Sequence, residues 1–201
     1  MHIAEGILSP LVIATGATIT TLGCAWGLHR AAPEAVVRMG MLAAAFFAFS
    51  LLHVPIAGTS VHLMGLGLMG LILGRGVWPA VVVALVIQAL FLGYGGLTSL
   101  GVTATVIALP AVISGWVMRR AGRHQVLISG IAGFAAVQLA LGLLALALWA
   151  SGAGLIAWIF VLAHQPVALL EGLLSAGAVQ YLRRCQSPLL HTHPTSQPTR
   201  S

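Results

Sequence analysis

The sequence predicts an all-α fold, a polytopic transmembrane helical bundle of about seven helices, on three observations. Hydrophobic residues make up 59% of the 201 residues, charged residues only 6%, and the mean hydropathy is +1.04. So few charges cannot cover the surface of a soluble domain. Seven apolar segments follow one another, and positive charge falls only in alternate connections between them. We therefore expect a multi-pass protein of the cell (inner) membrane.

The first three apolar segments differ in length and in glycine content. The first contains the small-xxx-small pair Gly23 and Gly27, which allows close packing of helices. The second begins at Arg38 and ends beside Pro55. The third is shorter than the roughly 20 residues that a membrane span requires, so neighbouring helices must shield its ends. These segments cover residues 7–29, 38–56 and 60–74.

The last four apolar segments are long enough to cross the hydrocarbon core. They cover residues 77–93, 100–118, 126–150 and 155–182, and arginine or glycine clusters separate them. The sequence therefore predicts one transmembrane domain over residues 1–184. A polar cytoplasmic tail, which we expect to be disordered, follows over residues 185–201.

The arginines predict the orientation of the bundle. The outer connections, around residues 57–59, 94–99 and 151–154, contain neither Lys nor Arg. Positive residues collect on the cytoplasmic side of membrane proteins, so the prediction is N-out and C-in. In this topology the inner side holds every arginine of the chain: Arg30, Arg38, Arg75, Arg119, Arg120, Arg123, Arg183, Arg184 and Arg200.

Composition excludes several classes of function. The chain has no lysine, so it cannot form a nucleotide-binding P-loop, whose lysine reaches the phosphates. A pI near 11.2 would point to nucleic acid in a soluble protein, but these arginines report topology, and we expect no nucleic-acid partner. Cys24 and Cys185 lack the C-x-x-C spacing of a thiolate metal site. We expect no permanently bound cofactor and no enzyme activity.

Three histidines are predicted to lie on the outer side of the membrane. His2 stands beside the N-terminal amine, His53 lies near the outer end of the second segment, and His62 opens the third. Pro55 and Gly58 interrupt the helix between the latter two, so helical spacing leaves open whether they meet. Each histidine alone has an ordinary alternative: an accidental terminal residue, a helix-end residue or a buried imidazole with its own hydrogen bonds.

A histidine at position two has a particular coordination chemistry. The Met1 amine, the His2 backbone nitrogen and the His2 imidazole can chelate one ion in fused rings when the amide deprotonates. Ni(II) and Cu(II) favour such a square-planar nitrogen set, and the imidazole of His62 can complete it. The amide anion offsets part of the charge of the dication, which matters where water is scarce.

Two glutamates and one further histidine are candidates for supporting roles. Glu5 either contacts the His2 site or simply favours the positive end of the first helix. Glu171 is the acid deepest in a membrane segment, where an unpaired carboxylate costs about 3 kcal/mol, so it needs a partner or a proton. His164 lies seven residues earlier, two turns along the same helix face. A structural brace and a proton-coupling role both remain open for this pair.

Four stretches of the chain resemble one known family, and M-H-I-x-E-G at the terminus is the most specific of their motifs. The opening residues M-H-I-A-E-G-I-L-S-P, the stretch 53–63 with H-V-P and G-T-S-V-H-L, residues 88–101 with G-G-L-T-S-L-G, and residues 164–172 with H-Q-P and E-G carry the resemblance. They are similar to the landmarks of the CbiM/NikM family, the cobalt/nickel substrate-specificity components of energy-coupling factor transporters, and span most of the chain in matching order.

The resemblance implies a metal site and a set of partners. The implied ligands are the Met1 amine, the backbone nitrogen and side chain of His2, and His62, with Ni(II) or Co(II) as the transported substrate. We expect His53, Ser60 and Thr98 to support these ligands or the surrounding structure. The implied partners are a transmembrane coupling subunit, a pair of cytoplasmic ATPases and, in some relatives, a small accessory membrane protein. The chain would work among membrane lipids.

The sequence departs from the family in two places and leaves alternatives open. Residues 102–106 read V-T-A-T-V where relatives often carry an asparagine-rich run, and His191 and His193 lie in the polar tail. The sequence leaves two alternative functions open. The first is a stand-alone metal permease. The second is an integral-membrane metalloenzyme or haem protein that uses His53, His62 and His164, although no H-E-x-x-H or repeated His-box is present.

Overall fold

The computed structural model describes residues 3–51, 53–56 and 59–186, and the described chain is an α-helical bundle. This confirms the predicted fold class. The α-helices are α1 (Pro10–Leu28), α2 (Pro33–Leu51), α3 (Leu66–Leu73), α4 (Val77–Leu92), α5 (Leu100–Arg120), α6 (Gln125–Trp149), α7 (Gly154–Ala163) and α8 (Gln165–Arg184). Two short 3₁₀ turns, η1 (Gly74–Gly76) and η2 (Gly122–His124), connect neighbouring helices.

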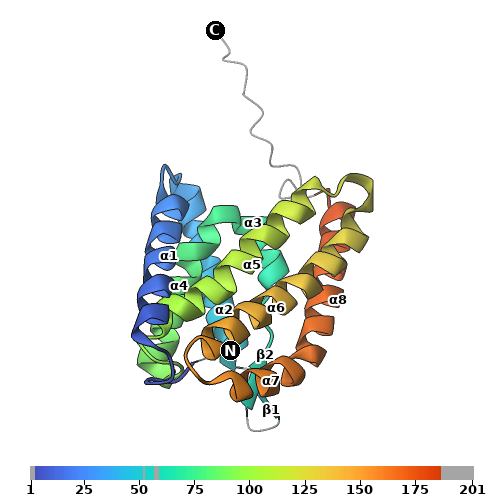
Figure 1. Ribbon diagram of the computed structural model, residues 1–201. Helices are drawn as coiled ribbons and strands as arrows, with labels where there is room; N and C mark the ends of the chain where they lie inside the picture. Colours follow the sequence, from blue (N-terminus) through green and yellow to red (C-terminus); the bar gives the residue numbers. More distant parts are fainter. Residues whose placement is uncertain (1–2, 52, 57–58, 187–201) are drawn as a thin grey trace.

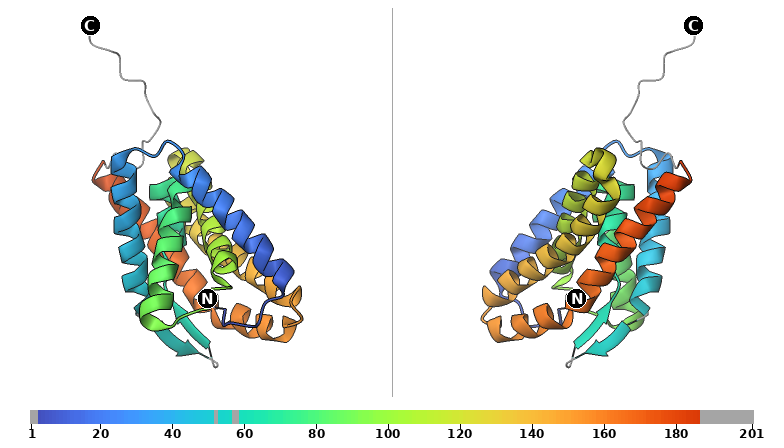
Figure 2. Two further views of the ribbon diagram at one scale, coloured as in Figure 1. Left: turned by 90° about the vertical axis from the view of Figure 1, so that its left-hand side faces the viewer. Right: turned by 90° about the vertical axis from the view of Figure 1, so that its right-hand side faces the viewer.

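The elements that connect the helices collect at two opposite ends of the bundle. Figure 1 and Figure 2 show the α1–α2 and α5–α6 connections at one end, and α7, the start of α1 and a small β-hairpin at the other. The arginines of the described chain lie in or next to the connections of the first end, which we call the arginine end. The positive-inside rule assigns this end to the cytoplasm, in agreement with the predicted orientation.

Among the described residues, five helical stretches qualify as membrane spans by length and composition, and the bent pair α7 and α8 raises the number to six. One of the five, residues 66–92, contains both α3 and α4. The chain reverses direction inside this stretch. The turn η1 lies at the arginine end, where its residue Arg75 donates to the backbone carbonyl of His29 (2.7 Å), and α4 then runs to the opposite end. The chain therefore passes between the two ends seven times, as predicted.

The hairpin corrects the boundaries of two predicted segments. Strands β1 (His53–Ile56) and β2 (Thr59–His62) pair antiparallel, where the prediction extended one helix to residue 56 and began the next at residue 60. Pro55 cannot continue a helix because it has no N–H to donate. The β-branched residues around it favour an extended backbone. Helix α2 therefore ends at Leu51, and α3 begins only at Leu66.

The last predicted segment, residues 155–182, is two helices rather than one. Helices α7 and α8 meet at His164 with a bend of 45°. Pro166 explains the break, since proline is tolerated in the first turn of a helix and not in its interior. The bend turns α7 across the end of the bundle beside β2.

Helices α3 and α5 pack at backbone contact. A Cβ atom added to Gly70 would lie 1.7 Å from the carbonyl oxygen of Ala111, and one added to Gly115 would lie 2.0 Å from the carbonyl of Gly70. Glycine is therefore required at both positions for this close approach. Arg119, at the end of α5, donates to the carbonyl oxygens of Gly70 (2.8 Å) and Leu71 (3.0 Å) in the last turn of α3.

We predict that Gly70→Ala destabilises the bundle by about 2 kcal/mol or more, because the added methyl group overlaps the backbone of α5. Gly142→Ala is the matched control: Gly142 lies in the interior of α6, and a Cβ there meets nothing within 4 Å. The control should match the wild type or gain up to about 1 kcal/mol. Thermal unfolding of the purified protein in detergent measures both, and equal melting of the two variants would contradict the packing described here.

Candidate metal site

The chain before α1 is held against the connection between α4 and α5. Ile3 is buried, and its carbonyl oxygen accepts hydrogen bonds from the backbone N–H of Gly96 (2.9 Å) and from the hydroxyl of Ser99 (2.7 Å). Ser99 is itself buried. These two bonds fix the first described residue of the chain inside the bundle, at the end opposite the arginines.

Glu5 binds the same connection from the solvent side. Thr98 donates its backbone N–H to Oε1 of Glu5 (3.1 Å) and its hydroxyl to Oε2. A Cβ at Gly96 would lie 2.6 Å from Cδ of Glu5, so only glycine admits the carboxylate here. The hydroxyl of Thr98, and then its backbone N–H, hold the pKa of Glu5 below its ordinary value. The contact between Glu5 and Thr98 therefore holds the N-terminal segment against the α4–α5 connection.

A third contact fixes the far end of this segment. The backbone N–H of Ser9 donates to the hydroxyl of Ser151 (3.0 Å) in the connection between α6 and α7, and Leu8 is buried beside it. Residues 3–9 thus form an N-terminal strap, attached at one end to the α4–α5 connection and at the other to the α6–α7 connection.

His62 ends strand β2 as a buried side chain with a defined ring orientation. Its Nδ1 lies 3.0 Å from the carbonyl oxygen of Leu63, and Phe46 meets the ring edge-on at 6.3 Å between centroids. A carbonyl only accepts hydrogen bonds, so Nδ1 carries the hydrogen and Nε2 of the neutral ring carries the lone pair. This is how metal-ligating histidines are commonly oriented.

The hairpin also answers the question that helical spacing left open. The Cα atoms of His53 and His62 are direct partners in the antiparallel register of β1 and β2. Ser60 lies in the same strand as His62, opposite Pro55. The backbone therefore brings all the histidines of this stretch to one end of the hairpin.

His164 is a second buried imidazole, and like that of His62 its Nδ1 is bonded to a backbone carbonyl. It stands at the bend between α7 and α8, is only 1% exposed, and donates from Nδ1 to the carbonyl of Phe160 (2.8 Å). Its Nε2 is buried and has no hydrogen-bond partner in the part of the chain that the structure describes. Helix α7, which ends immediately before it, packs against β2. His164 thus presents a buried nitrogen lone pair.

Glu171 caps helix α3. Its carboxylate is 1% exposed and accepts the backbone N–H groups of Met64 (2.5 Å), Gly65 (2.5 Å) and Leu66 (3.1 Å). These amides have no partner inside a helix, and the positive end of the helix dipole favours a negative charge there. Among the described residues, Glu171 makes no hydrogen bond to His164, so the position of the carboxylate is set by the chain that follows His62.

Two further polar side chains, Gln88 and Thr105, lie on the helices of the bundle. Gln88 of α4 is fully buried, and neither atom of its amide has a partner among the described residues. Sequence reasoning did not select it, although a glutamine inside an apolar membrane segment is itself a signal. In residues 102–106, which depart from the family pattern, the hydroxyl of Thr105 lies 3.0 Å from the hydroxyl of Thr20. This stretch therefore binds α1 rather than the strap.

The predicted ligands are not all among the described residues. Met1, His2, His191 and His193 lie outside them, and of His53 and Ser60 only the backbone is described. Among the described residues, no group of three or more His, Cys, Asp or Glu side chains is arranged so that it could hold a metal ion. Strand β2, which ends at His62, lies at the same end of the bundle as the N-terminus (Figure 1).

The comparison with known families is decisive. Residues 2–189 match the family model CbiM, described as "Cobalt uptake substrate-specific transmembrane region". The chain belongs to the CbiM family. Members of this family are multi-pass transmembrane proteins of metal transport rather than enzymes, in line with the fold described above.

Individual relatives agree over nearly the whole chain. A "Putative metal transport protein" of Haemophilus influenzae is 36% identical and aligns over 90% of this chain and 93% of its own length. The "Cobalt transport protein CbiM" of Sorangium cellulosum is also 36% identical, over 94% of each chain. A solved structure titled "Crystal Structure of an Truncated Transition metal Transporter" superposes with a TM-score of 0.74 at 26% identity, covering 92% of this CbiM-family chain and 99% of the other.

We predict that Glu171→Gln destabilises the protein by about 2 kcal/mol, because the amide loses charge-assisted bonds and turns an N–H group toward the three backbone donors at and just before the start of α3. Glu34→Gln is the control, since Glu34 lies in the exposed first turn of α2, where the dipole contributes about 0.3–1 kcal/mol. Thermal unfolding in detergent measures both. Equal losses of stability in the two variants would mean that the buried Glu171 contributes no more than an exposed glutamate at a helix start.

We further predict that Thr98→Val raises the pKa of Glu5 toward its ordinary value, whereas Thr98→Ser keeps it low, because serine retains the hydroxyl donor. The folded pKa lies below the unfolded one, so this contact stabilises the strap above the unfolded pKa and is lost as the pH falls through the folded pKa. The carboxyl ¹³C chemical shift of Glu5, followed against pH, measures the pKa directly. An unchanged pKa in the valine variant would contradict the assignment.

Proposed function

We propose that this chain captures Ni(II) or Co(II) at the outer face of the membrane, as the substrate-binding component of an energy-coupling factor transporter. The observation that carries the proposal is the burial of Ile3 and the two hydrogen bonds to its carbonyl. Relatives named "Cobalt transport protein CbiM" and "Fused nickel transport protein NikMN" support the choice of metals.

Covalent geometry links the buried Ile3 to the proposed ligands. Successive Cα atoms are about 3.8 Å apart, so the Cα of Met1 lies within about 7.6 Å of the Cα of Ile3 in any conformation. A free Met1 amine, the His2 amide nitrogen and the His2 imidazole are therefore tethered to a fixed point inside the bundle. These three nitrogens form the fused chelate rings that a square-planar ion requires.

His62 supplies the fourth nitrogen in this proposal. Its Nδ1–H is committed to the carbonyl of Leu63, so the lone pair of the neutral ring is on Nε2, as a metal ligand requires. An amide anion at His2 gives the occupied site one negative charge against the dication, which lowers the cost of burial. The Irving–Williams order places nickel and cobalt next to each other, and square-planar nitrogen coordination favours nickel somewhat.

The buried polar groups without partners support a role around the occupied site. Nε2 of His164 is an acceptor, and a metal-bound amine has N–H groups to donate. We place His164 in this supporting role, together with the amide of Gln88, and assign Glu5, Thr98 and Glu171 to holding the strap and α3 in place. His53 and Ser60 stay candidates for support from the hairpin.

The energy for uptake comes from partner chains in this proposal. The chain lacks lysine and with it a P-loop, so ATP hydrolysis belongs to a pair of cytoplasmic ATPases. A transmembrane coupling subunit passes their movement to the bundle, and a small accessory membrane protein completes the assembly in some systems. A stand-alone permease is the alternative. Metal uptake by a deficient host that expresses this chain with and without the ATPases separates the two.

We predict that one extra residue before Met1, or acetylation of its amine, lowers Ni(II) affinity at least about tenfold, since one of four ligands is lost, a change of 1.4 kcal/mol or more. His62→Ala should do the same. Extending the terminus leaves every described contact of the strap in place. Calorimetric titration of the purified protein with Ni(II) and Co(II), together with the visible spectrum of the nickel complex, measures the effect.

His29→Ala is the matched control, because His29 is exposed in the α1–α2 connection at the arginine end and should leave the affinity unchanged. Wild-type affinity in the extended or acetylated protein would remove the amine from the site. Wild-type affinity in the His62 variant would remove the imidazole. Loss of affinity in the His29 variant would show that the effect is not local.

A further inference from the structure

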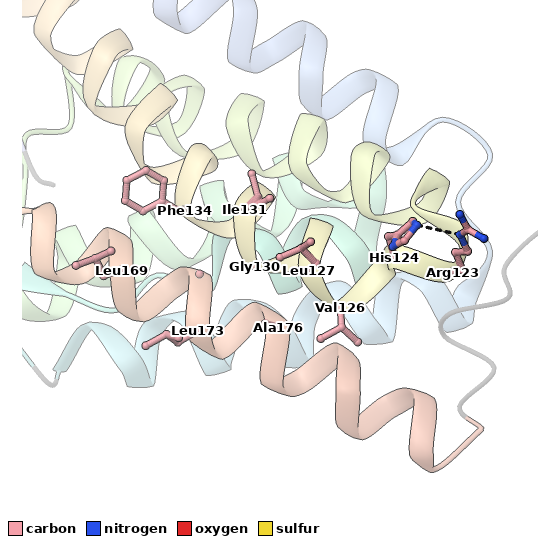
Figure 3. Close-up of a pocket in the computed structure, with 11 residues that line it drawn as sticks. Arg123, His124, Val126, Leu127, Gly130, Ile131, Phe134, Leu169, Leu173 and Ala176 are labelled. Carbon is pink, nitrogen blue, oxygen red and sulfur yellow. Dashed lines mark hydrogen bonds between the residues drawn. The ribbon is translucent and has the colours of Figure 1, made fainter.

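A long apolar groove runs between α6 and α8 on the outside of the bundle. Its floor is made of small residues at the place where the two helices touch: a Cβ at Gly172 would lie 2.9 Å from the carbonyl oxygen of Gly130, and Ala176 lies beside Gly130. Its volume is about 830 Å³. Figure 3 shows large apolar side chains of both helices along its length, namely Leu127, Ile131, Phe134, Leu169 and Leu173.

The edges of this α6–α8 groove face outward. Leu127 and Ile131 of α6 are 65% and 59% exposed, and Leu169 and Leu173 of α8 are 60% and 70% exposed. In a bundle that spans a membrane, these side chains meet lipid or another membrane-embedded partner. The groove therefore lies open to the hydrocarbon region along most of its length.

One end of the groove is cationic. Arg123 and His124, in the η2 turn, line the groove at the arginine end, and Nε of Arg123 donates to Nε2 of His124 (2.9 Å). Arg183, in the last turn of α8, donates to the backbone carbonyl of Arg123 (3.4 Å). Arg123 lines this end of the groove, and the hydrogen bond brings the guanidinium group of Arg183, from the last turn of α8, next to the backbone of Arg123.

The chain offers no anion to these guanidinium groups in its described part. Its only acids are Glu5, Glu34 and Glu171. Glu5 is bound to Thr98 at the opposite end, Glu171 caps α3, and Glu34 lies in the first turn of α2, which does not line the groove. The neighbouring Arg119 and Arg120 already have partners, since Arg119 donates to the carbonyls of α3 and Arg120 stacks on Trp116 at 3.9 Å.

We propose that the α6–α8 groove binds one anionic phospholipid of the cytoplasmic leaflet. One acyl chain lies along the apolar floor, and the phosphate accepts hydrogen bonds from Arg123 and Arg183. Basic pockets between transmembrane helices on the cytoplasmic side are a recognised way of binding such headgroups, and Arg pairs well with phosphate. A helix of a partner subunit would fill the apolar part of the groove but leave both guanidinium groups without an anion.

Native mass spectrometry of the full-length protein in detergent tests this proposal. The probes are palmitoyl-oleoyl phosphatidylglycerol, the matching phosphatidylcholine, and free glycerol phosphate. We expect the wild type to bind phosphatidylglycerol at least tenfold more tightly than phosphatidylcholine. The double variant Arg123→Gln/Arg183→Gln should bind both lipids equally. Glycerol phosphate should not displace the lipid, because it lacks the chain that fills the groove.

Arg38→Gln is the matched control, because it removes an exposed guanidinium near the same end of the bundle, on α2, away from the groove. It should keep the preference for phosphatidylglycerol. Leu173→Trp narrows the groove without changing charge and should weaken binding of both lipids at least threefold.

Four results would overturn the proposal. The first is a wild type with no headgroup preference, and the second is an unchanged preference in the double arginine variant. The third is displacement of the lipid by glycerol phosphate, which would indicate a free-anion site. Loss of coupling-subunit binding in Leu173→Trp with lipid binding intact would identify the groove as a protein-docking surface instead.

Discussion

A carboxylate inside the membrane segment holds the central irregular part of this fold together. Glu171 accepts three successive backbone N–H groups at the start of α3, and it does so from α8, more than 100 residues away in sequence. Non-helical backbone at membrane depth is stable only where its polar groups are satisfied by protein or water. The chain can therefore leave the hairpin after His62, pass through residues 63–65 without regular secondary structure and begin a helix of only 8 residues in the interior.

The candidate metal site is built from two such irregular stretches on a rigid bundle. The strap of residues 3–9 is held by Ser99, Thr98 and Ser151, and the stretch that follows His62 is held by Glu171. A metal site needs ligands whose positions are fixed before the ion arrives, because ordering them afterwards weakens binding. Short polar side chains on neighbouring connections supply that order here. The helices contribute the frame and exclude water.

The sequence predicted the bundle, its seven passages and the one-sided arginines because each depends on composition over many residues. It did not predict the hairpin or the break at His164, which Pro55 and Pro166 cause within otherwise apolar runs. The spacing of Glu171 and His164 on one helix face offered a local partner for the carboxylate, but the actual donors are backbone amides distant in sequence. Such contacts leave no local pattern. The motif at the terminus pointed to Met1 and His2, which lie outside the described residues.

Charge is sparse in this chain, and several of the charged groups in its described part bind backbone groups of other elements. Helix α3 shows the consequence: Glu171 of α8 binds its first turn, and Arg119 of α5 binds the carbonyls of its last turn. Both charges match the helix dipole. Since α3 packs at backbone contact against α5 through Gly70 and Gly115, the position of α3 relative to α5 is closely fixed. A shift of α5 relative to α8 must then strain or break the Glu171 contacts, which lie only two residues beyond His62 at their nearest point. These contacts thus connect α5 and α8 to the chain beside the histidine that we propose as a metal ligand.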